Sequence, residues 1–207
     1  MRQGRQQVCS WVSWGLLGLL TWLVMHHATG VQHVDQWVFG VLHHHLASGG
    51  IRWFVVFSTL GSPVVTTGLV LILAGWAWWR GHRRRAGGFT LAILGADALA
   101  WGLKQLVARP RPSAPLVPDT GYSFPSGHVV SAMILALVIW WLLAQGVRAG
   151  HLRLSLNLLV GVGVLVILVS RLYLRDHYPS DTVASLLLAV GWWEQVRFWW
   201  PLSETSR

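Results

Sequence analysis

The stretch SLNLLVGVGVLVILVSRLYLRDHYPSD, residues 155–181, joins a strongly apolar segment to a short polar one. The apolar part runs to Val169, and the residues that follow from Thr182 are apolar again. The polar part between them holds two of the seven acidic residues in the whole chain. A helix needs roughly 20 mostly apolar residues to cross a bilayer. The alternation therefore predicts two membrane-spanning helices that meet at a charged connection.

The composition of the whole chain extends this prediction. Of its 207 residues 54% are hydrophobic and only 11% are charged, whereas soluble domains carry about a quarter charged residues. We therefore expect an all-α, polytopic membrane protein that forms a single membrane-embedded domain over residues 1–207. Its six transmembrane helices are expected at about 9–25, 60–79, 86–106, 126–143, 154–174 and 180–200.

The N-terminal part raises two further expectations. The first span follows Arg2 and Arg5, as a secretory signal would, but no small-residue cleavage site follows it, so we expect a retained span. The single cysteine, Cys9, excludes an internal disulfide. Between the first two spans, five apolar residues fall on one helical face, which predicts an amphipathic helix in the outer interface. They are Val34, Trp37, Val38, Val41 and Leu42.

The arginines predict the orientation. If six spans alternate, most of them fall on one side, which the positive-inside rule makes cytoplasmic together with both termini. These are Arg2, Arg5, Arg80, Arg83, Arg84, Arg85, Arg148, Arg153, Arg197 and Arg207. The net charge of +9 forms no continuous stripe, so anionic lipid headgroups or phosphate substrates are expected in place of nucleic acid. The expected location is the cell membrane.

Three motifs face the opposite, extracytoplasmic side: KQLVARPRP at 104–112, FPSGH at 124–128 and the polar stretch 170–181. Lys104, Arg111 and Arg171 supply cations from three separate elements, and such side chains bind phosphate oxygens. Ser126 is a natural N-cap, and Gly127 permits close approach of an anion to the backbone N–H groups at a helix start. Together they predict a phosphoryl-binding pocket at the membrane surface.

Two histidines suit the chemistry of such a pocket. His177 and Asp181 are four residues apart near the start of a helix. If Asp181 accepts the Nδ1–H of His177, the Nε2 atom stays unprotonated and can attack phosphorus. His128 lies on another helix and can protonate the leaving oxygen and then activate water.

These motifs resemble the tripartite signature of the type 2 phosphatidic acid phosphatase family, K-x6-R-P, P-S-G-H and S-R-x5-H-x3-D, and the six-span layout is similar to its bacterial integral-membrane branch. The matching residues are Lys104, Arg111, Pro112, Pro125, Ser126, Gly127, His128, Ser170, Arg171, His177 and Asp181. The resemblance implies a metal-independent lipid phosphatase without a cofactor, which works through a phosphohistidine on His177. The outward site favours undecaprenyl pyrophosphate as substrate, because that carrier lipid is recycled there. Phosphatidylglycerophosphate and phosphatidic acid are the alternatives.

Other functions remain open at this stage. A phosphotransferase would pass the phosphoryl group to another lipid or glycan, and a vanadate-dependent oxidant would use the same anion pocket. A lipid-binding or scaffold protein would lack chemistry altogether. Membrane lipids are the expected surroundings, and no obligate protein partner is inferred.

Several residues outside the signature carry weaker expectations. Asp97, inside the third span, either pairs with a basic group beside the cavity or is a hydrogen-bonded structural residue. Arg109 and Arg175 are expected to contact headgroups, with less weight than Arg111 and Arg171. Four prolines make residues 109–122 either a stiff loop at the site or an ordinary connector. The consecutive histidines His43, His44 and His45 suggest a polar, pH-sensitive helix face more than a metal site.

Overall fold

The computed structural model of the protein describes residues 2–45 and 50–202, and within this part it contains helices and no strands. The helices are α1 (Arg2–Met25), α2 (Thr29–His45), α3 (Ile51–Leu60), α4 (Pro63–Trp79), α5 (Arg83–Val107), α6 (Gly127–Gly146), α7 (Gly150–Tyr173) and α8 (Pro179–Trp199). The side chains of His43, His44 and His45 lie outside the described part, so the expectation for them stays open. The predicted all-helical class is confirmed.

Five helical runs are long and apolar enough to cross a membrane: Gly4–Met25, Ile51–Trp79, Arg83–Val107, Gly127–Gly146 and Gly150–Tyr173. They correspond to the first five predicted spans, except that the second begins at α3 and continues through α4. Four apolar side chains of α7 are exposed: Leu158, Leu159, Val162 and Leu165. Apolar surface on this scale marks a membrane-contacting protein.

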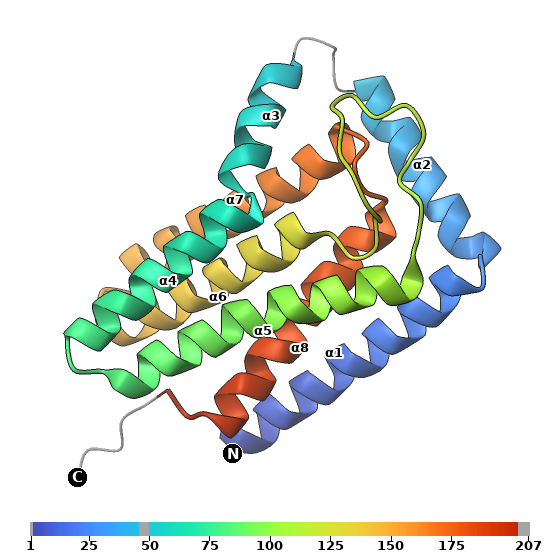
Figure 1. Cartoon of the computed structure of the whole chain (residues 1–207). Helices are drawn as coiled ribbons and strands as arrows, with labels where there is room; N and C mark the ends of the chain where they lie inside the picture. The colour runs from blue at the N-terminus through green and yellow to red at the C-terminus, as the bar shows by residue number, and fades with distance from the viewer. Residues whose placement is uncertain (1, 46–49, 203–207) are drawn as a thin grey trace.

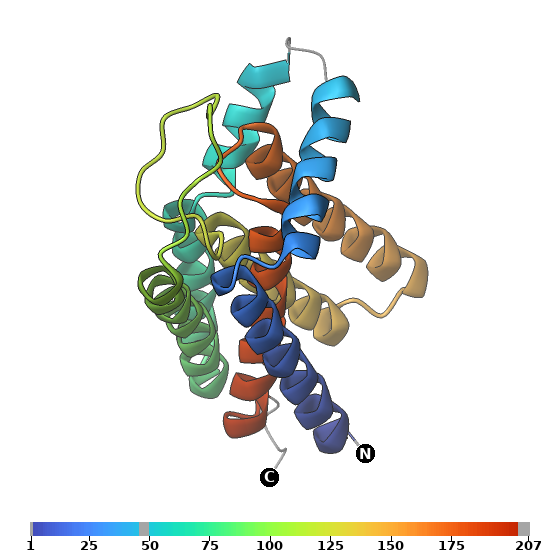
Figure 2. The same ribbon diagram turned by 90° about the vertical axis from the view of Figure 1, so that its right-hand side faces the viewer.

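The sixth predicted span, 180–200, coincides with α8, but α8 does not reach the hydropathy of the other five. Glu194, Gln195 and Arg197 lie along it. The physical reason is its position, since α8 packs against α1, α5 and α6 in the middle of the bundle (Figure 2). A helix surrounded by other helices needs less apolar surface than one that faces lipid. Hydropathy alone therefore does not determine the number of spans.

Helices α2 and α3 project from the end of the bundle that is opposite to the start of α1 and the end of α8 (Figure 1). A helix, α2, is present where the amphipathic helix was predicted, and its residues Val34, Trp37 and Val41 are exposed. Its place in the membrane interface stays a prediction. Helix α3 is separated from α4 by Gly61 and Ser62, and the Ser62 side chain accepts a hydrogen bond from the N–H of Val65 to cap α4.

Close packing at small residues joins the helices of the bundle. A Cβ atom on Gly95 would lie 2.3 Å from the Trp192 ring, whose Nε1–H donates to the carbonyl of Ala92 at 3.1 Å. Asp97 accepts hydrogen bonds from Thr67 of α4 and Ser131 of α6, both at 2.7 Å. These two contacts favour the structural interpretation of Asp97, which ties three helices together.

Candidate functional site

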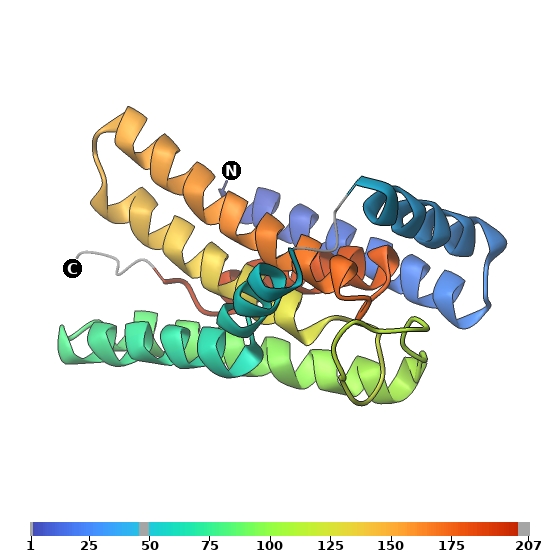
Figure 3. The same ribbon diagram turned by 90° about the horizontal axis from the view of Figure 1, so that it is seen from above.

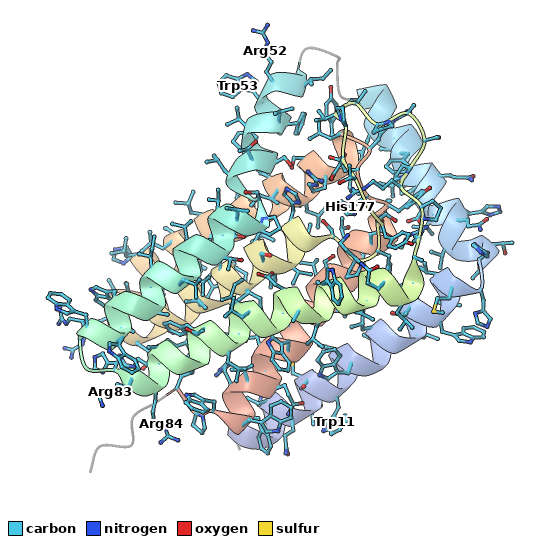
Figure 4. All side chains as sticks on the ribbon, in the orientation of Figure 1. Trp11, Arg52, Trp53, Arg83, Arg84 and His177 are labelled. Atoms are coloured by element: carbon cyan, nitrogen blue, oxygen red, sulfur yellow. The ribbon has the colours of Figure 1, made fainter. Side chains whose placement is uncertain are left out.

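The signature residues meet at the end of the bundle where α2 and α3 project. The loop between α5 and α6, residues 108–126, folds back over the α7–α8 connection, and Figure 3 shows that connection between the loop and α2. His177 lies within this region (Figure 4). The three predicted motifs therefore converge on one site, although they are separated along the chain.

Arg111 and Lys104 are held by carbonyl oxygens of the 108–126 loop. Lys104 Nζ donates to the carbonyl of Tyr122 at 2.7 Å. Arg111 donates to the carbonyls of Thr120 at 2.8 Å and Gly121 at 3.1 Å. These contacts fix both cations without neutralising them, because a carbonyl oxygen carries no full charge.

Arg171, at the end of α7, is 4% exposed. Its Nη1 donates to the hydroxyl of Ser58 and lies 3.2 Å from the Asp176 carboxylate. Its Nη2 donates to Asp119 at 2.7 Å. A buried guanidinium with this many partners has a fixed direction, so its fork is held ready for an anion.

Asp119 connects the two signature arginines. One of its carboxylate oxygens, Oδ2, lies 3.0 Å from Arg111 Nη1 and 2.7 Å from Arg171 Nη2. Although partial burial opposes the shift, the charges of Arg111 and Arg171 hold the pKa of Asp119 below its usual value. A single anionic oxygen thus occupies the position between two guanidinium groups, which is the chemistry that a phosphate oxygen would need.

His177 is 1% exposed, and its two ring nitrogens have different surroundings. Nδ1 lies 2.7 Å from the carbonyl oxygen of Ser123, which can only accept, so Nδ1 carries the hydrogen. Nε2 lies 3.5 Å from Arg111 Nη1. Burial lowers the pKa of the imidazole to about 4, although the Asp181 carboxylate opposes that shift. The ring is therefore neutral near pH 7, with its lone pair at Nε2 on the cationic side.

The expected hydrogen bond between His177 and Asp181 is not the short contact at Nδ1. The Asp181 carboxylate lies 3.7 Å away, beyond the distance to the Ser123 carbonyl. Asp181 instead accepts from the backbone N–H of Tyr178 at 2.9 Å, which caps its own helix, and from Arg109 at 2.6 Å. Its effect on His177 is thus the field of a nearby negative charge more than a direct bond.

His128 and Arg171 open into a cavity of about 270 Å³ that Ser62, Asp119 and Asp176 also line. The cavity lies beneath the 108–126 loop and beside the α3–α4 break. Burial raises the pKa of Asp176 to about 6, while the charge of Arg171 acts in the opposite direction. The cavity therefore combines cationic, carboxylate and imidazole groups in one small volume.

Ser126 and Gly127 begin α6 as predicted, but the Ser126 side chain makes no capping hydrogen bond. Its hydroxyl is fully buried and has no hydrogen-bond partner among the described residues. The Ser126 backbone N–H donates to the hydroxyl of Ser185 at 2.8 Å. The site residues of the sequence prediction are thus all near this end of the bundle, with His177 and Arg111 in direct proximity.

The sequence prediction did not include the residues whose carboxylate, hydroxyl or main-chain oxygens contact the site's cations and His177. These residues are Asp35, Ser58, Asp119, Ser123 and Asp176. The prediction also underrated Arg109. One signal was available, because a chain with seven acidic residues places four of them, at 35, 119, 176 and 181, around this site. Carboxylates in so apolar a chain are expected to have cationic partners. No feature of the sequence indicates that the main-chain carbonyl of Ser123 accepts a hydrogen bond from His177.

The sequence also matches known proteins. Two curated relatives carry the name phosphatidylglycerophosphatase B. The Bacillus subtilis protein is 31% identical over 126 residues, which cover 59% of this chain and 61% of the relative. The Haemophilus influenzae protein is 42% identical over 74 residues, which cover 34% of this chain and 30% of the relative. The matched regions thus span less than two thirds of either relative.

Two solved structures share the fold. A transmembrane PAP2-type phosphatidylglycerolphosphate phosphatase from Bacillus subtilis has a TM-score of 0.80 at 22% identity, covering 96% of this chain and 98% of the other. LpxE from Aquifex aeolicus has a TM-score of 0.61 at 21% identity, covering 78% and 93%. The family model described as PAP2 superfamily matches residues 85–201, more than half of the chain and all three signature motifs. The chain belongs to the PAP2 superfamily.

Proposed function

We propose that this protein is a membrane-embedded lipid phosphatase that forms a covalent phosphohistidine on His177. The observation that carries the proposal is the setting of His177, whose Nδ1–H is bound by the Ser123 carbonyl while Nε2 lies beside the Arg111 guanidinium. A neutral imidazole whose unprotonated Nε2 faces a fixed cation is suited to attack a phosphoryl group bound to that cation.

In the proposed first step, Nε2 of His177 attacks phosphorus and forms a P–N bond as the P–O bond to the lipid breaks. Lys104, Arg111 and Arg171 bind the phosphoryl oxygens and stabilise the charge of the transition state. Ser126 and Gly127 complete the pocket at the start of α6. His128 donates a proton to the departing lipid oxygen. The products of this step are the lipid alcohol and the phosphorylated imidazole.

In the second step, water attacks the phosphorus of the phosphohistidine, and a P–O bond forms as the P–N bond breaks. This step releases inorganic phosphate and restores the neutral imidazole of His177. His128 has lost its proton in the first step and now takes one from the water. The negative charge of Asp181 stabilises the cationic phosphorylated imidazole, and the Ser123 carbonyl keeps Nδ1–H oriented. Each step conserves the protons among these groups, and the proposal assigns the stabilisation of charge to Lys104, Arg111 and Arg171.

Phosphatidylglycerophosphate is the proposed substrate, ahead of undecaprenyl pyrophosphate. The resemblance of the motifs alone favoured undecaprenyl pyrophosphate, because the site was expected to face outward. The names of the two curated relatives favour phosphatidylglycerophosphate instead. The three cations recognise a phosphoryl group as such, so the choice between the two lipids depends on the remainder of the headgroup.

The proposed location of the site is the extracytoplasmic surface of the cell membrane. The α4–α5 and α6–α7 turns and both described chain ends lie at the end of the bundle opposite to His177 (Figures 1 and 4). Arg83 and Arg84 lie at that end, as does Trp11 (Figure 4). By the positive-inside rule, the arginine-rich end is cytoplasmic. The N- and C-termini are then cytoplasmic, and α2 lies in the outer interface.

Phosphate release by the purified protein in detergent, with EDTA present, tests the proposal. Phosphatidylglycerophosphate, undecaprenyl pyrophosphate and phosphatidic acid are compared side by side, and we expect the fastest release from the first. Release that requires added metal would contradict the mechanism. Transfer of the phosphoryl group to an added lipid or glycan acceptor, without free phosphate, would identify a phosphotransferase.

The protonation of His177 provides a prediction about pH. Its ordinary pKa is 6.5, and burial lowers the pKa to about 4 in the folded protein. The ring therefore stays neutral on acidification until the pH approaches 4. Between about 4 and 6.5 the unfolded chain binds a proton that the folded chain does not, so stability falls as the pH falls through this window. Imidazole ¹⁵N chemical shifts of histidine-labelled protein measure the midpoint, and a midpoint at or above 6.5 contradicts the expectation.

Asp119 provides a second prediction. Because its carboxylate lies on Arg111 and Arg171, it competes with any phosphate for these cations. Asp119→Asn is therefore expected to lower the inhibition constant of inorganic phosphate roughly twofold to fivefold, a range that suits a partly exposed ion pair. Glu194→Gln, which removes a carboxylate from Arg197 at the other end of the bundle, is the control. Weaker inhibition in the Asp119 variant would show that the carboxylate does not compete.

A further inference from the structure

Helix α2 contributes a buried carboxylate to the site although it lies outside both the signature and the residues matched by the family model. Asp35 is 2% exposed. Its Oδ1 accepts from the backbone N–H of Ser180 at 2.9 Å, and its Oδ2 accepts from the Ser180 hydroxyl at 2.7 Å and from Arg109 Nη2 at 2.8 Å. Asp35 thus binds the first turn of α8 and the 108–126 loop at once.

Arg109 continues this chain of contacts to the residues beside His177. Its Nη1 donates to Asp181 Oδ1 at 2.6 Å and to the Ser180 hydroxyl at 2.7 Å. Its guanidinium lies over the Tyr178 ring, 3.9 Å from the ring centre. The other Asp181 oxygen is the one that lies 3.7 Å from His177 Nδ1. One arginine fork is therefore shared between two buried carboxylates, and the second of these faces the imidazole.

We infer that Asp35 and Arg109 are positioning residues for His177, and that α2 takes part in the reaction through the chain Asp35–Arg109–Asp181–His177; this inference rests on the proposed function. Neither side chain touches the cavity that His128 and Arg171 line. They act by setting the place and the effective charge of Asp181. With Asp35 present, the Arg109 charge is divided between two carboxylates, so Asp181 keeps much of its negative field at His177.

The charge argument gives opposite signs for the two residues. In Asp35→Asn, Asp181 becomes the single carboxylate paired with Arg109, and the surroundings of His177 become more positive. Protonated and phosphorylated forms of the ring are then disfavoured, and the midpoint of the His177 titration moves to lower pH. Arg109→Gln removes the cation, makes the surroundings more negative and moves the midpoint to higher pH. A role that is only structural would loosen the site in both variants and move both midpoints upward, toward 6.5.

The remaining charged and titratable groups around His177 stay constant in this comparison. They are Lys104, Arg111, His128, Arg171 and Asp181. Because both substitutions lie outside this set, a change in the titration reports on the Asp35–Arg109 pair. Asparagine at position 35 keeps the size and the planar group of the aspartate, whereas glutamine at position 109 keeps a planar polar group on a shorter side chain.

The experiment measures two quantities in the full-length protein in detergent. The first is phosphate release, where we expect kcat to fall roughly tenfold in each variant with little change in KM. In Asp35→Asn the fall comes from the disfavoured phosphorylated ring, and in Arg109→Gln it comes from the loss of the side chain that holds Asp181 in place. In the double variant Asp35→Asn/Arg109→Gln, we expect the loss to be smaller than the product of the two single losses. The second is the ¹⁵N titration of His177, assigned with His177→Gln.

The matched control is Glu194→Gln, which breaks a different arginine–carboxylate pair, with Arg197, and is expected to leave both quantities unchanged. Thermal unfolding shows whether each variant is folded; if Asp35→Asn is not, the double variant, which removes both buried charges, replaces it. Shifts of the same sign in both single variants, or an unchanged kcat, overturn the inference. If the wild type releases no phosphate from any lipid, the proposed function fails, while opposite shifts of the His177 midpoint still support the chain of contacts.

Discussion

Replacing His177 with alanine is expected to lower the rate of phosphate release at least about a thousandfold, as the loss of a nucleophile does in other enzymes that work through covalent intermediates. The side chain is buried between the Ser123 carbonyl and Arg111, and its unprotonated Nε2 faces the Arg111 guanidinium. Water cannot replace His177 as the nucleophile of the first step without a further general base, because His128 acts as the proton donor in that step. The rate is measured as phosphate released from phosphatidylglycerophosphate in detergent.

Two further measurements test whether His177 is the nucleophile. His151→Ala, at the start of α7 and exposed, is the matched control and should leave the rate unchanged. Rapid denaturation of the wild type during turnover should yield a phosphorylated peptide that contains His177, identified by mass spectrometry, and the variant should yield none. A variant that retains more than about a tenth of the wild-type rate would contradict nucleophilic catalysis by His177.

Replacing His128 with alanine is expected to lower the rate by roughly a hundredfold to ten-thousandfold, the usual contribution of a general acid and base. His128 lines the cavity together with Arg171 and lies on α6, apart from the helix that follows His177. The loss should depend on the leaving group. A lipid alcohol needs a proton to depart, whereas p-nitrophenolate does not, so p-nitrophenyl phosphate should lose much less in its first step.

The second step gives an independent measurement for His128. Without a base to activate water, the phosphorylated enzyme should accumulate when p-nitrophenyl phosphate is the substrate. A burst of p-nitrophenol, equal to the amount of enzyme and followed by slow turnover, would record that accumulation. Equal losses for both substrates and no burst would assign His128 a role in binding alone.

Much of the fold could be predicted because apolar length is written directly in the sequence. The first five spans appear as helices at the expected positions, and the three motifs meet at one end of the bundle. The break between α3 and α4 was not predicted, because apolar residues continue on both sides of Gly61. The lower hydropathy of α8 is explained by its position between α1, α5 and α6, which the sequence does not reveal.

The cations and histidines of the site could be predicted because charged groups in an apolar chain are conspicuous. Their partners could not. Asp35 and Arg109 are 74 residues apart, and nothing in the local sequence of either indicates the other. Asp119 belongs to a proline-rich loop whose path depends on tertiary contacts, among them the ion pairs of Asp119 with Arg111 and Arg171. Pairings of this kind depend on tertiary structure, which periodicity and spacing do not encode.

The hydrogen bond from His177 to the carbonyl of Ser123 has a consequence for how the protein tolerates genetic change. A main-chain oxygen is present whatever residue occupies position 123, so no single codon change there can delete the acceptor that selects the imidazole tautomer. The carboxylates around it have no such protection, since one nucleotide can convert an aspartate codon to one for asparagine. In lineages that diverge under weak selection, the tautomer of the histidine should therefore outlast the pattern of charges that tunes it.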